Sequence, residues 1–147
     1  MKLEFLFPDM KALNAHAKGN SHFAKSAATK QSRTLAKFIC LDMLNRKQVH
    51  PIVGRVLLSY AFYVPSDHRR DAANMIQAMK PTIDGIVDAG LIEGDHWQVL
   101  TIYNVSVEID KKNPRVEISI SAADSVGDLI HKVPITRPAT AESITRT

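Results

Sequence analysis

Alternation of apolar and polar side chains marks three segments of the chain as β-strands. Residues 2–7 place apolar side chains at every second position and stop at Pro8, and this period of two is typical of a strand with one buried face. Residues 105–109 and 116–120 show the same alternation on either side of the short polar segment 111–114. We therefore predict that these two segments pair as a C-terminal hairpin with one buried and one wet face.

The segment 53–64 has a different pattern, because it is apolar almost throughout. It is rich in Val, Leu, Tyr and Phe and contains no internal proline, which predicts a strand at the centre of a sheet. Its aromatic residues, Tyr60, Phe62 and Tyr63, are expected in the core or at a dimer surface rather than as a platform for nucleobases.

Two longer segments have a helical period. The first begins at about Ser26 and must end before His50-Pro51, since a residue that precedes proline is pushed out of the helical region. The second covers residues 71–89 and ends at Gly90, a plausible C-cap. Pro81 lies inside it and either kinks the helix or begins a new one. The predicted buried stripe of the first helix consists of Leu35, Phe38, Ile39 and Met43.

The order of these elements indicates one small α/β (α+β) domain. A strand, a polar loop at 14–22, a helix, a strand, a second helical segment and a hairpin predict a mixed sheet with two main helices packed on it. The domain is expected to cover residues 1–122. The tail 123–147 is rich in Ser, Thr and Ala without a clear period, so it is expected to be partly ordered at best.

Composition narrows the class of protein. The chain has 147 residues, of which 45% are hydrophobic, enough for one core without covalent crosslinks. Its single cysteine, Cys40, excludes an intramolecular disulfide and a four-cysteine zinc site, and its apolar neighbours predict a buried thiol. No run is long enough for a membrane span or a signal peptide. We therefore expect a reducing, intracellular location and no membrane partner.

Charge is distributed unevenly along the chain. The net charge is +4, yet residues 1–50 carry nine Lys and Arg against three Asp and Glu. Residues 71–95 reverse this balance, with five acids and the single base Lys80. A basic region together with an acidic cluster is typical of a protein that binds a polyanion and a cation.

The positions of the acids separate them into two groups. Asp88 and Glu93 are expected on a solvated helix face. Asp71 lies where a strand exit turns into a helix, and Asp95 lies just beyond the far end of that helix. From spacing alone the two carboxylates converge only if the chain after Gly90 runs back along the helix, so convergence is possible but not required.

Three motifs in this region resemble the RusA family of Holliday junction resolvases. They are Arg-Asp-Ala-Ala-Asn at 70–74, Lys-Pro-Thr-Ile-Asp-Gly at 80–85, and Asp-Ala-Gly-Leu-Ile-Glu-Gly-Asp at 88–95 followed by Gln98. The family pattern is Arg-Asp-x-Asp-Asn at a helix start, then a lysine and an aspartate four apart, then an aspartate eleven residues later. The resemblance implies a small homodimeric, magnesium-dependent endonuclease, commonly encoded by phages and prophages, that cuts symmetric strands of four-way DNA junctions.

The resemblance also implies roles for individual residues. Mg²⁺, with Mn²⁺ able to substitute, is expected at carboxylate oxygens, and Lys80 is expected to place a positive charge beside the phosphate. Ala73 stands where the family has its second motif aspartate, so a substitute ligand is needed; we favour Asp84, with Asn74 and Glu93 as alternatives. The expected catalytic residues are Asp71, Asn74, Lys80, Asp84 and Asp95, and the expected metal ligands are Asp71, Asp84 and Asp95.

Basic side chains outside the acidic cluster are expected to hold the DNA, without an organic cofactor. The expected DNA-binding residues are Lys18, Lys25, Lys30, Arg33, Lys37, Arg69 and Arg70. Phosphate contacts of this kind make binding strongly dependent on salt. Two alternatives remain open: a junction-binding protein that does not cut, because of Ala73, and a basic RNA-binding domain. The expected location is the cytoplasm of a bacterium or of a phage-infected cell.

Overall fold

The computed structural model describes residues 1–13 and 22–123. The segment 14–21, with the predicted DNA-binding Lys18, and the tail 124–147 lie outside the described residues. The elements in chain order are β1 (Lys2–Leu6), α1 (Met10–Leu13), α2 (His22–Asn45), β2 (Val56–Val64), α3 (Ala72–Ala78), α4 (Lys80–Asp88), β3 (Leu100–Ile109) and β4 (Arg115–Ala122).

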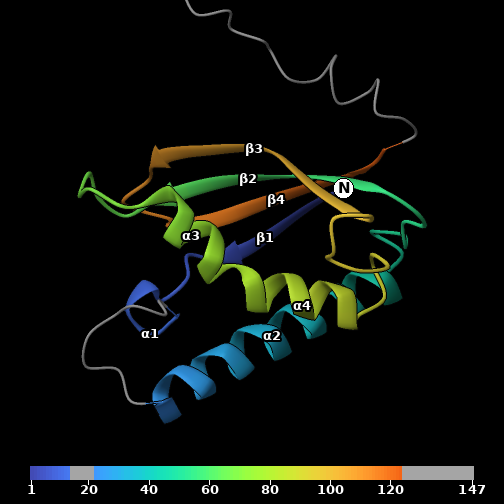
Figure 1. Cartoon of the computed structure of the whole chain (residues 1–147), viewed down its shortest axis with the longest axis horizontal. Helices are drawn as coiled ribbons and strands as arrows, with labels where there is room; N and C mark the ends of the chain where they lie inside the picture. Colours follow the sequence, from blue (N-terminus) through green and yellow to red (C-terminus); the bar gives the residue numbers. More distant parts are fainter. Residues whose placement is uncertain (14–21, 124–147) are drawn as a thin grey trace, which may run out of the picture.

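The four strands form one mixed sheet in the order β1-β4-β2-β3 (Figure 1). The strand β2 is central, as its apolar sequence predicts, and pairs with β3 in parallel and with β4 antiparallel. The helices α3 and α4 form the crossover between the parallel strands β2 and β3, as parallel pairing requires. With the helices on one side of the sheet, the structure confirms a single α+β domain over the described residues.

The predicted C-terminal hairpin is wrong. The strands β3 and β4 are consecutive in the chain, but β2 lies between them in the sheet. The link at 110–114 must pass the end of β2, a distance of two strand spacings or about 10 Å, which five residues span easily. Insertion of β2 between two neighbours buries the most apolar strand of the chain, and local alternation of side chains carries no information about that choice.

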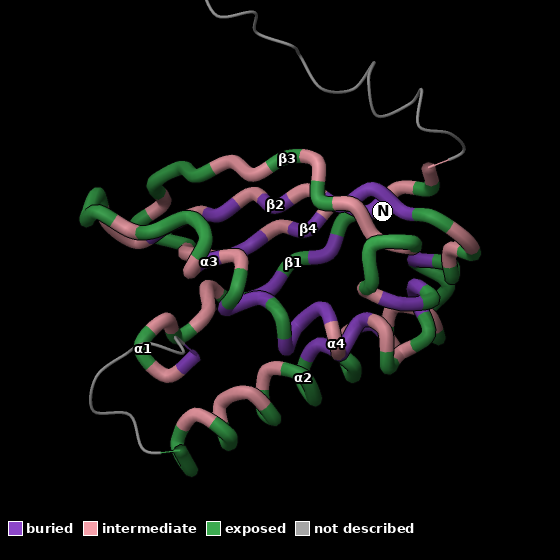
Figure 2. Tube along the Cα trace, viewed as in Figure 1, coloured by how far each residue is buried: buried purple, intermediate pink, exposed green. Residues whose placement is uncertain are grey.

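The core lies between the sheet and the helices (Figure 2). On β4 the alternation predicted from the sequence is confirmed, because Val116, Ile118 and Ile120 are at most 1% exposed. The edge strand β3 is covered far less, and Ile102, with 42% of its surface exposed, is one example. The sheet is therefore well packed around β2 and β4 and open along β3.

The second helical segment is divided into two helices at Met79. The helix α3 ends there, and α4 begins with Pro81 in its first turn, where the missing amide donor of proline costs nothing. After α4, Gly90 adopts φ +80°, a left-handed conformation that glycine takes at no steric cost. This confirms the second of the two interpretations of Pro81 and the role of Gly90 at the helix end.

Two of the four residues predicted on the inward face of α2 do pack against the core, and the other two do not. Ala36 and Cys40 are buried, whereas Leu35 and Phe38 are 48% and 63% exposed. The cause is the close approach of α4: a Cβ atom on Gly85 would lie 2.3 Å from the Arg33 carbonyl oxygen. Small side chains are needed where two helix backbones come this close, so Ala36 lies at the contact and Leu35 is displaced from it.

The thiol of Cys40 is fully buried, as its apolar neighbours predict. Burial raises the pKa of Cys40 to about 11, so the thiol remains protonated and unreactive at neutral pH. Among the described helices, none combines the length and the apolar composition needed to cross a membrane.

Candidate active site

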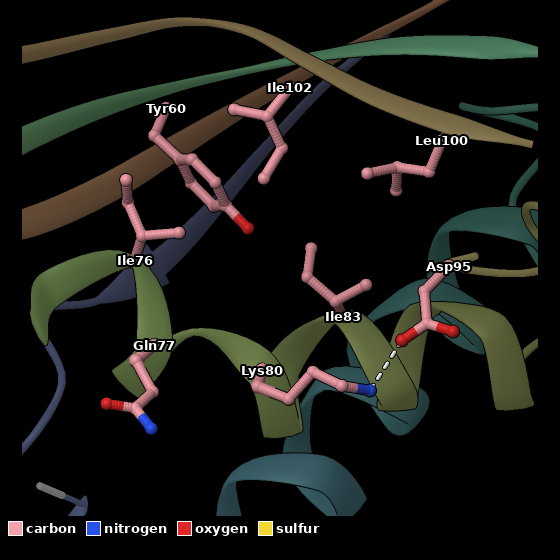
Figure 3. Close-up of a pocket in the computed structure, with 8 residues that line it drawn as sticks. All are labelled: Tyr60, Ile76, Gln77, Lys80, Ile83, Asp95, Leu100 and Ile102. Atoms are coloured by element: carbon pink, nitrogen blue, oxygen red, sulfur yellow. Dashed lines mark hydrogen bonds and ion pairs between the residues drawn. The ribbon is translucent and has the colours of Figure 1, made fainter. Parts of the chain in front are cut away.

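Lys80, Asp84 and Asp95 meet at one point of the surface and are called the Lys80 cluster below. The Lys80 ammonium donates hydrogen bonds to Asp84 Oδ1 and to Asp95 Oδ2. Lys80 and Asp84 are one turn apart on α4, and Asp95 comes from the segment between α4 and β3. Figure 3 shows the bond between Lys80 and Asp95.

The return of the chain after α4 brings Asp95 to the start of that helix. Gly90 turns the backbone, and Leu91 and Ile92 are then buried. The Ile52 amide donates to the Leu91 carbonyl at 2.9 Å, and Ile52 forms a bridge with Ile92. These contacts hold the segment beside the fold, so the chain does run back along the helix, as convergence of Asp71 with Asp95 would require.

Mutual attraction stabilises the charged forms of this cluster. The hydrogen bond from Lys80 lowers the pKa of Asp95, with burial as a smaller opposing effect. Burial acts to lower the pKa of Lys80, and the hydrogen bonds to Asp84 and Asp95 outweigh it and raise that pKa. Two carboxylates against one ammonium leave a formal charge of −1, which favours a further cation.

The donor set of the cluster fits a hard divalent cation. Both carboxylates already share one ammonium group, so their oxygens converge on one position. Mg²⁺ commonly takes one or two carboxylates and completes its shell with water and phosphate oxygens. Asp84 and Asp95 would hold such an ion once the Lys80 ammonium moves aside.

Asp71 does not join the cluster. It caps α3, where its Oδ1 accepts from the Ala73 and Asn74 amides at 2.9 and 3.3 Å. Asp71 therefore lies at the start of α3, whereas Lys80 is the first residue of the separate helix α4. Among the described residues, no group of three His, Cys, Asp or Glu side chains is arranged to hold a metal ion. The predicted set of three aspartates is therefore not assembled, and Asn74 stays beside Asp71.

The acids expected on a solvated face have specific partners. Glu93 is exposed, as expected, and its Oε2 accepts a hydrogen bond from the Gly54 amide at 3.1 Å. Asp88 accepts two bonds from the Arg33 guanidinium, at 2.6 and 2.9 Å. Both contacts join segments far apart in the sequence, which spacing along one helix does not reveal.

Two of the arginines predicted to bind DNA have structural partners. Arg33 joins α2 to α4 through Asp88. Arg70 donates to the carbonyls of Ser66 and His68 at 2.8 and 3.0 Å and to the Ser66 hydroxyl at 2.9 Å. Arg70 therefore braces the loop after β2, while the neighbouring Arg69 is exposed.

The three described lysines of α2 that were predicted to bind DNA differ in exposure. Lys30 and Lys37 are exposed and Lys25 is partly exposed, so they remain available for phosphate contacts. Lys37 also lies close enough to Asp88 to contribute to the lowering of its pKa, after the larger effect of Arg33.

A cavity of about 280 Å³ adjoins the Lys80 cluster, and sequence reasoning missed it. Lys80, Asp95 and Gln77 lie among its lining residues, and its apolar walls come from Tyr60, Ile76, Ile83, Leu100 and Ile102. The walls belong to β2, β3, α3 and α4 (Figure 3). The cavity lies where β3 pairs in parallel with β2. The sequence pattern paired β3 with β4 instead, so it could not predict a cavity between β2, β3 and the helices.

Comparison with models of known protein families and with curated protein sequences found no match.

Proposed function

We propose that this protein is a divalent-metal-dependent endonuclease that cuts four-way DNA junctions. The observation that carries the proposal is the convergence of Lys80, Asp84 and Asp95. These residues match the lysine and the two following aspartates of the resolvase pattern, and their meeting supports a shared role. The carboxylates would hold Mg²⁺ or Mn²⁺, which when bound activates water and stabilises charge on a phosphate.

The side chains around the cluster would have separate tasks. Lys80 would leave the carboxylates when the ion binds, and its long stem would keep the ammonium near the phosphate. The exposed lysines of α2 would add phosphate contacts that do not depend on sequence. A four-way junction has two-fold symmetry, so cleavage of two opposed strands fits a homodimer with one site per subunit.

A second function is favoured by one observation. Asp71 caps α3 at a distance from the Lys80 cluster, and Ala73 offers no ligand in place of the family's aspartate. With only two carboxylates at the cluster, a protein that binds junctions without cutting them is the alternative. The two functions share the same DNA and differ in the fate of the phosphodiester.

Cleavage of a synthetic four-way junction separates these functions. We expect the wild-type protein to cut opposed strands with Mg²⁺ or Mn²⁺ and to bind without cutting in EDTA. Asp95→Asn should bind the junction and cut at least 100-fold more slowly, a change of about 2.7 kcal/mol in the barrier. The matched control is Asp88→Asn, a carboxylate on α4 paired with Arg33, which should cut at nearly the wild-type rate.

Three outcomes would change the conclusion. Binding by all proteins with cleavage by none would favour the junction-binding alternative. Equal cutting by wild type and Asp95→Asn would remove the Lys80 cluster from the reaction. Equal affinity for the junction and a duplex of the same length at matched salt would contradict a junction-specific function.

A further inference from the structure

The cavity beside the Lys80 cluster combines apolar walls with one fixed polar group. Its volume of about 280 Å³ lies at the lower end of small-molecule sites, which suits a single ring system better than a whole nucleotide. The walls come from the sheet on one side and from α3 and α4 on the other (Figure 3). Lys80 and Asp95 lie at one side of this space.

The fixed polar group is the hydroxyl of Tyr60. The residue is 2% exposed, and its ring stacks on Phe62 with centroids 5.5 Å apart. The hydroxyl points into the cavity in Figure 3, and no hydrogen bond from a described residue contributes to its pKa. Burial raises the pKa of the Tyr60 phenol, so the group stays protonated and can both donate and accept.

We propose that this cavity receives one unstacked base of the DNA strand whose phosphate lies at the Lys80 cluster, with the Tyr60 hydroxyl bonded to the edge of that base. The inference rests on the proposed function and deepens it, because it assigns the residue that sets base preference. Enzymes that extrude a base hold it between apolar or aromatic side chains and read its polar edge. Unstacking costs a few kcal/mol and is least costly for a base that is already unpaired.

A second copy of this chain is a less suitable occupant. An apolar side chain from another subunit would fill the walls but leave the Tyr60 hydroxyl without a partner. It would also lie next to the charged groups of Lys80 and Asp95. A base can both fill the apolar walls with its faces and give the Tyr60 hydroxyl a hydrogen-bond partner with its polar edge.

Nucleotide titration tests the cavity independently of any junction. The probes are the four deoxynucleoside 5′-monophosphates in the presence of Ca²⁺, followed by methyl NMR signals of Ile83 and Ile102. We expect one nucleotide to shift both signals in a saturable way and to leave Val107, also on β3, unchanged. Ile102→Trp should fill the cavity and weaken this binding at least tenfold. The control Val107→Trp, which changes a similarly exposed residue of the same strand, should not.

A junction labelled with 2-aminopurine at each position around the branch tests the extruded base. With Ca²⁺ in place of Mg²⁺, fluorescence should rise several-fold at one position for wild type and Val107→Trp, and stay low for Ile102→Trp. In the cleavage reaction, Tyr60→Phe should reduce the preference between bases at the cut site by roughly two- to tenfold, the range for loss of one neutral hydrogen bond.

The outcomes distinguish this inference from the proposed function. Saturable nucleotide binding at the cavity without junction cleavage would retain the base site and overturn the endonuclease. Junction cleavage with no nucleotide shift and no fluorescence rise at any position would retain the endonuclease and overturn the base site. A change from dimer to monomer in Ile102→Trp, with neither base signal seen in wild type, would assign the cavity to a second copy.

Discussion

The two sides of helix α4 differ in how closely they are packed and in the partners of their carboxylates. Towards α2 it is closed: Gly85 lets the two backbones approach, and Asp88 is bound by Arg33. Towards β3 it is open: Lys80 and Asp84 meet Asp95 at the rim of a cavity. The same nine-residue helix therefore carries a structural ion pair on one side and a candidate reaction site on the other.

The difference lies in what surrounds each carboxylate. Arg33 lies on α2, which packs against α4, and is 55 residues from Asp88 in the chain. Its planar guanidinium binds both carboxylate oxygens of Asp88 at once. Lys80 holds Asp84 and Asp95 from a flexible stem with a single point charge. Another cation can therefore replace the Lys80 ammonium easily. The ion pair of Arg33 with Asp88 instead joins two helices and has a structural role.

The largest effect on stability should come from adding a side-chain atom between α2 and α4. In Gly85→Ala the new Cβ atom would meet backbone of α2 at 2.3 Å, so the helices must move apart. We expect a loss of about 1–3 kcal/mol in the free energy of unfolding, despite the better helix propensity of alanine. Urea denaturation measures this change.

Gly94→Ala is the matched substitution on the open side. There the new Cβ atom would meet only the His96 ring, at 3.0 Å, and that exposed ring can rotate away. Its effect on stability should be clearly smaller than that of Gly85→Ala. Equal losses in the two variants would contradict a difference in packing between the two sides of α4.

A divalent cation should stabilise the open side. For an assumed dissociation constant of about 1 mM, 10 mM Mg²⁺ would stabilise the folded protein by about 1.4 kcal/mol, which thermal unfolding detects as a higher Tm. In Lys80→Gln the competing ammonium is gone, so the rise in Tm with Mg²⁺ should be larger than in wild type.

The closed side supplies the control for this experiment. Arg33→Gln also removes a cation from a carboxylate of α4, but it leaves the single group Asp88 without a second one beside it. Its Tm should respond to Mg²⁺ as wild type does. If Mg²⁺ raised the Tm of Arg33→Gln as much as that of Lys80→Gln, any carboxylate freed from its partner would bind the ion. The Lys80 cluster would then not be a specific metal site.

The smallest effect should appear in acid, on the closed side. The Arg33 hydrogen bonds lower the pKa of Asp88 below the ordinary 3.8. A carboxylate with a lowered pKa stabilises the fold above its unfolded-state value, and this contribution disappears as the pH falls through the folded-state value. The stability difference between wild type and Arg33→Gln should therefore be constant near neutral pH and shrink below about pH 4. A constant difference across that range would contradict the pairing.

The features of the fold that depend on local pattern could be predicted from the sequence. Proline and glycine marked the start and the end of α4, and the apolar run of β2 marked a central strand. The pairing of β3 could not be predicted, because alternation fits a hairpin and a parallel crossover equally well. The inward face of α2 was predicted only in part, since the close approach allowed by Gly85 places Ala36 rather than Leu35 at the contact.

The candidate site was predicted in part. The spacing of Lys80, Asp84 and Asp95 identified residues that do meet. Asp71 matches the same pattern, yet its carboxylate satisfies two backbone amides at a helix start, and a motif does not distinguish that use from metal binding. Tyr60 was expected in the core, where its ring does lie, but the direction of one hydroxyl depends on tertiary packing.

The position of β4 in the sheet has a consequence for how the chain folds during synthesis. This strand is the last of the four along the polypeptide and lies between β1 and β2, and the Met1 ammonium donates to the Ile120 carbonyl at 2.6 Å. During synthesis, β1 has no neighbour until residues 115–122 have left the ribosome. Of these four strands, β1 must therefore wait for β4, so the sheet is completed late in synthesis.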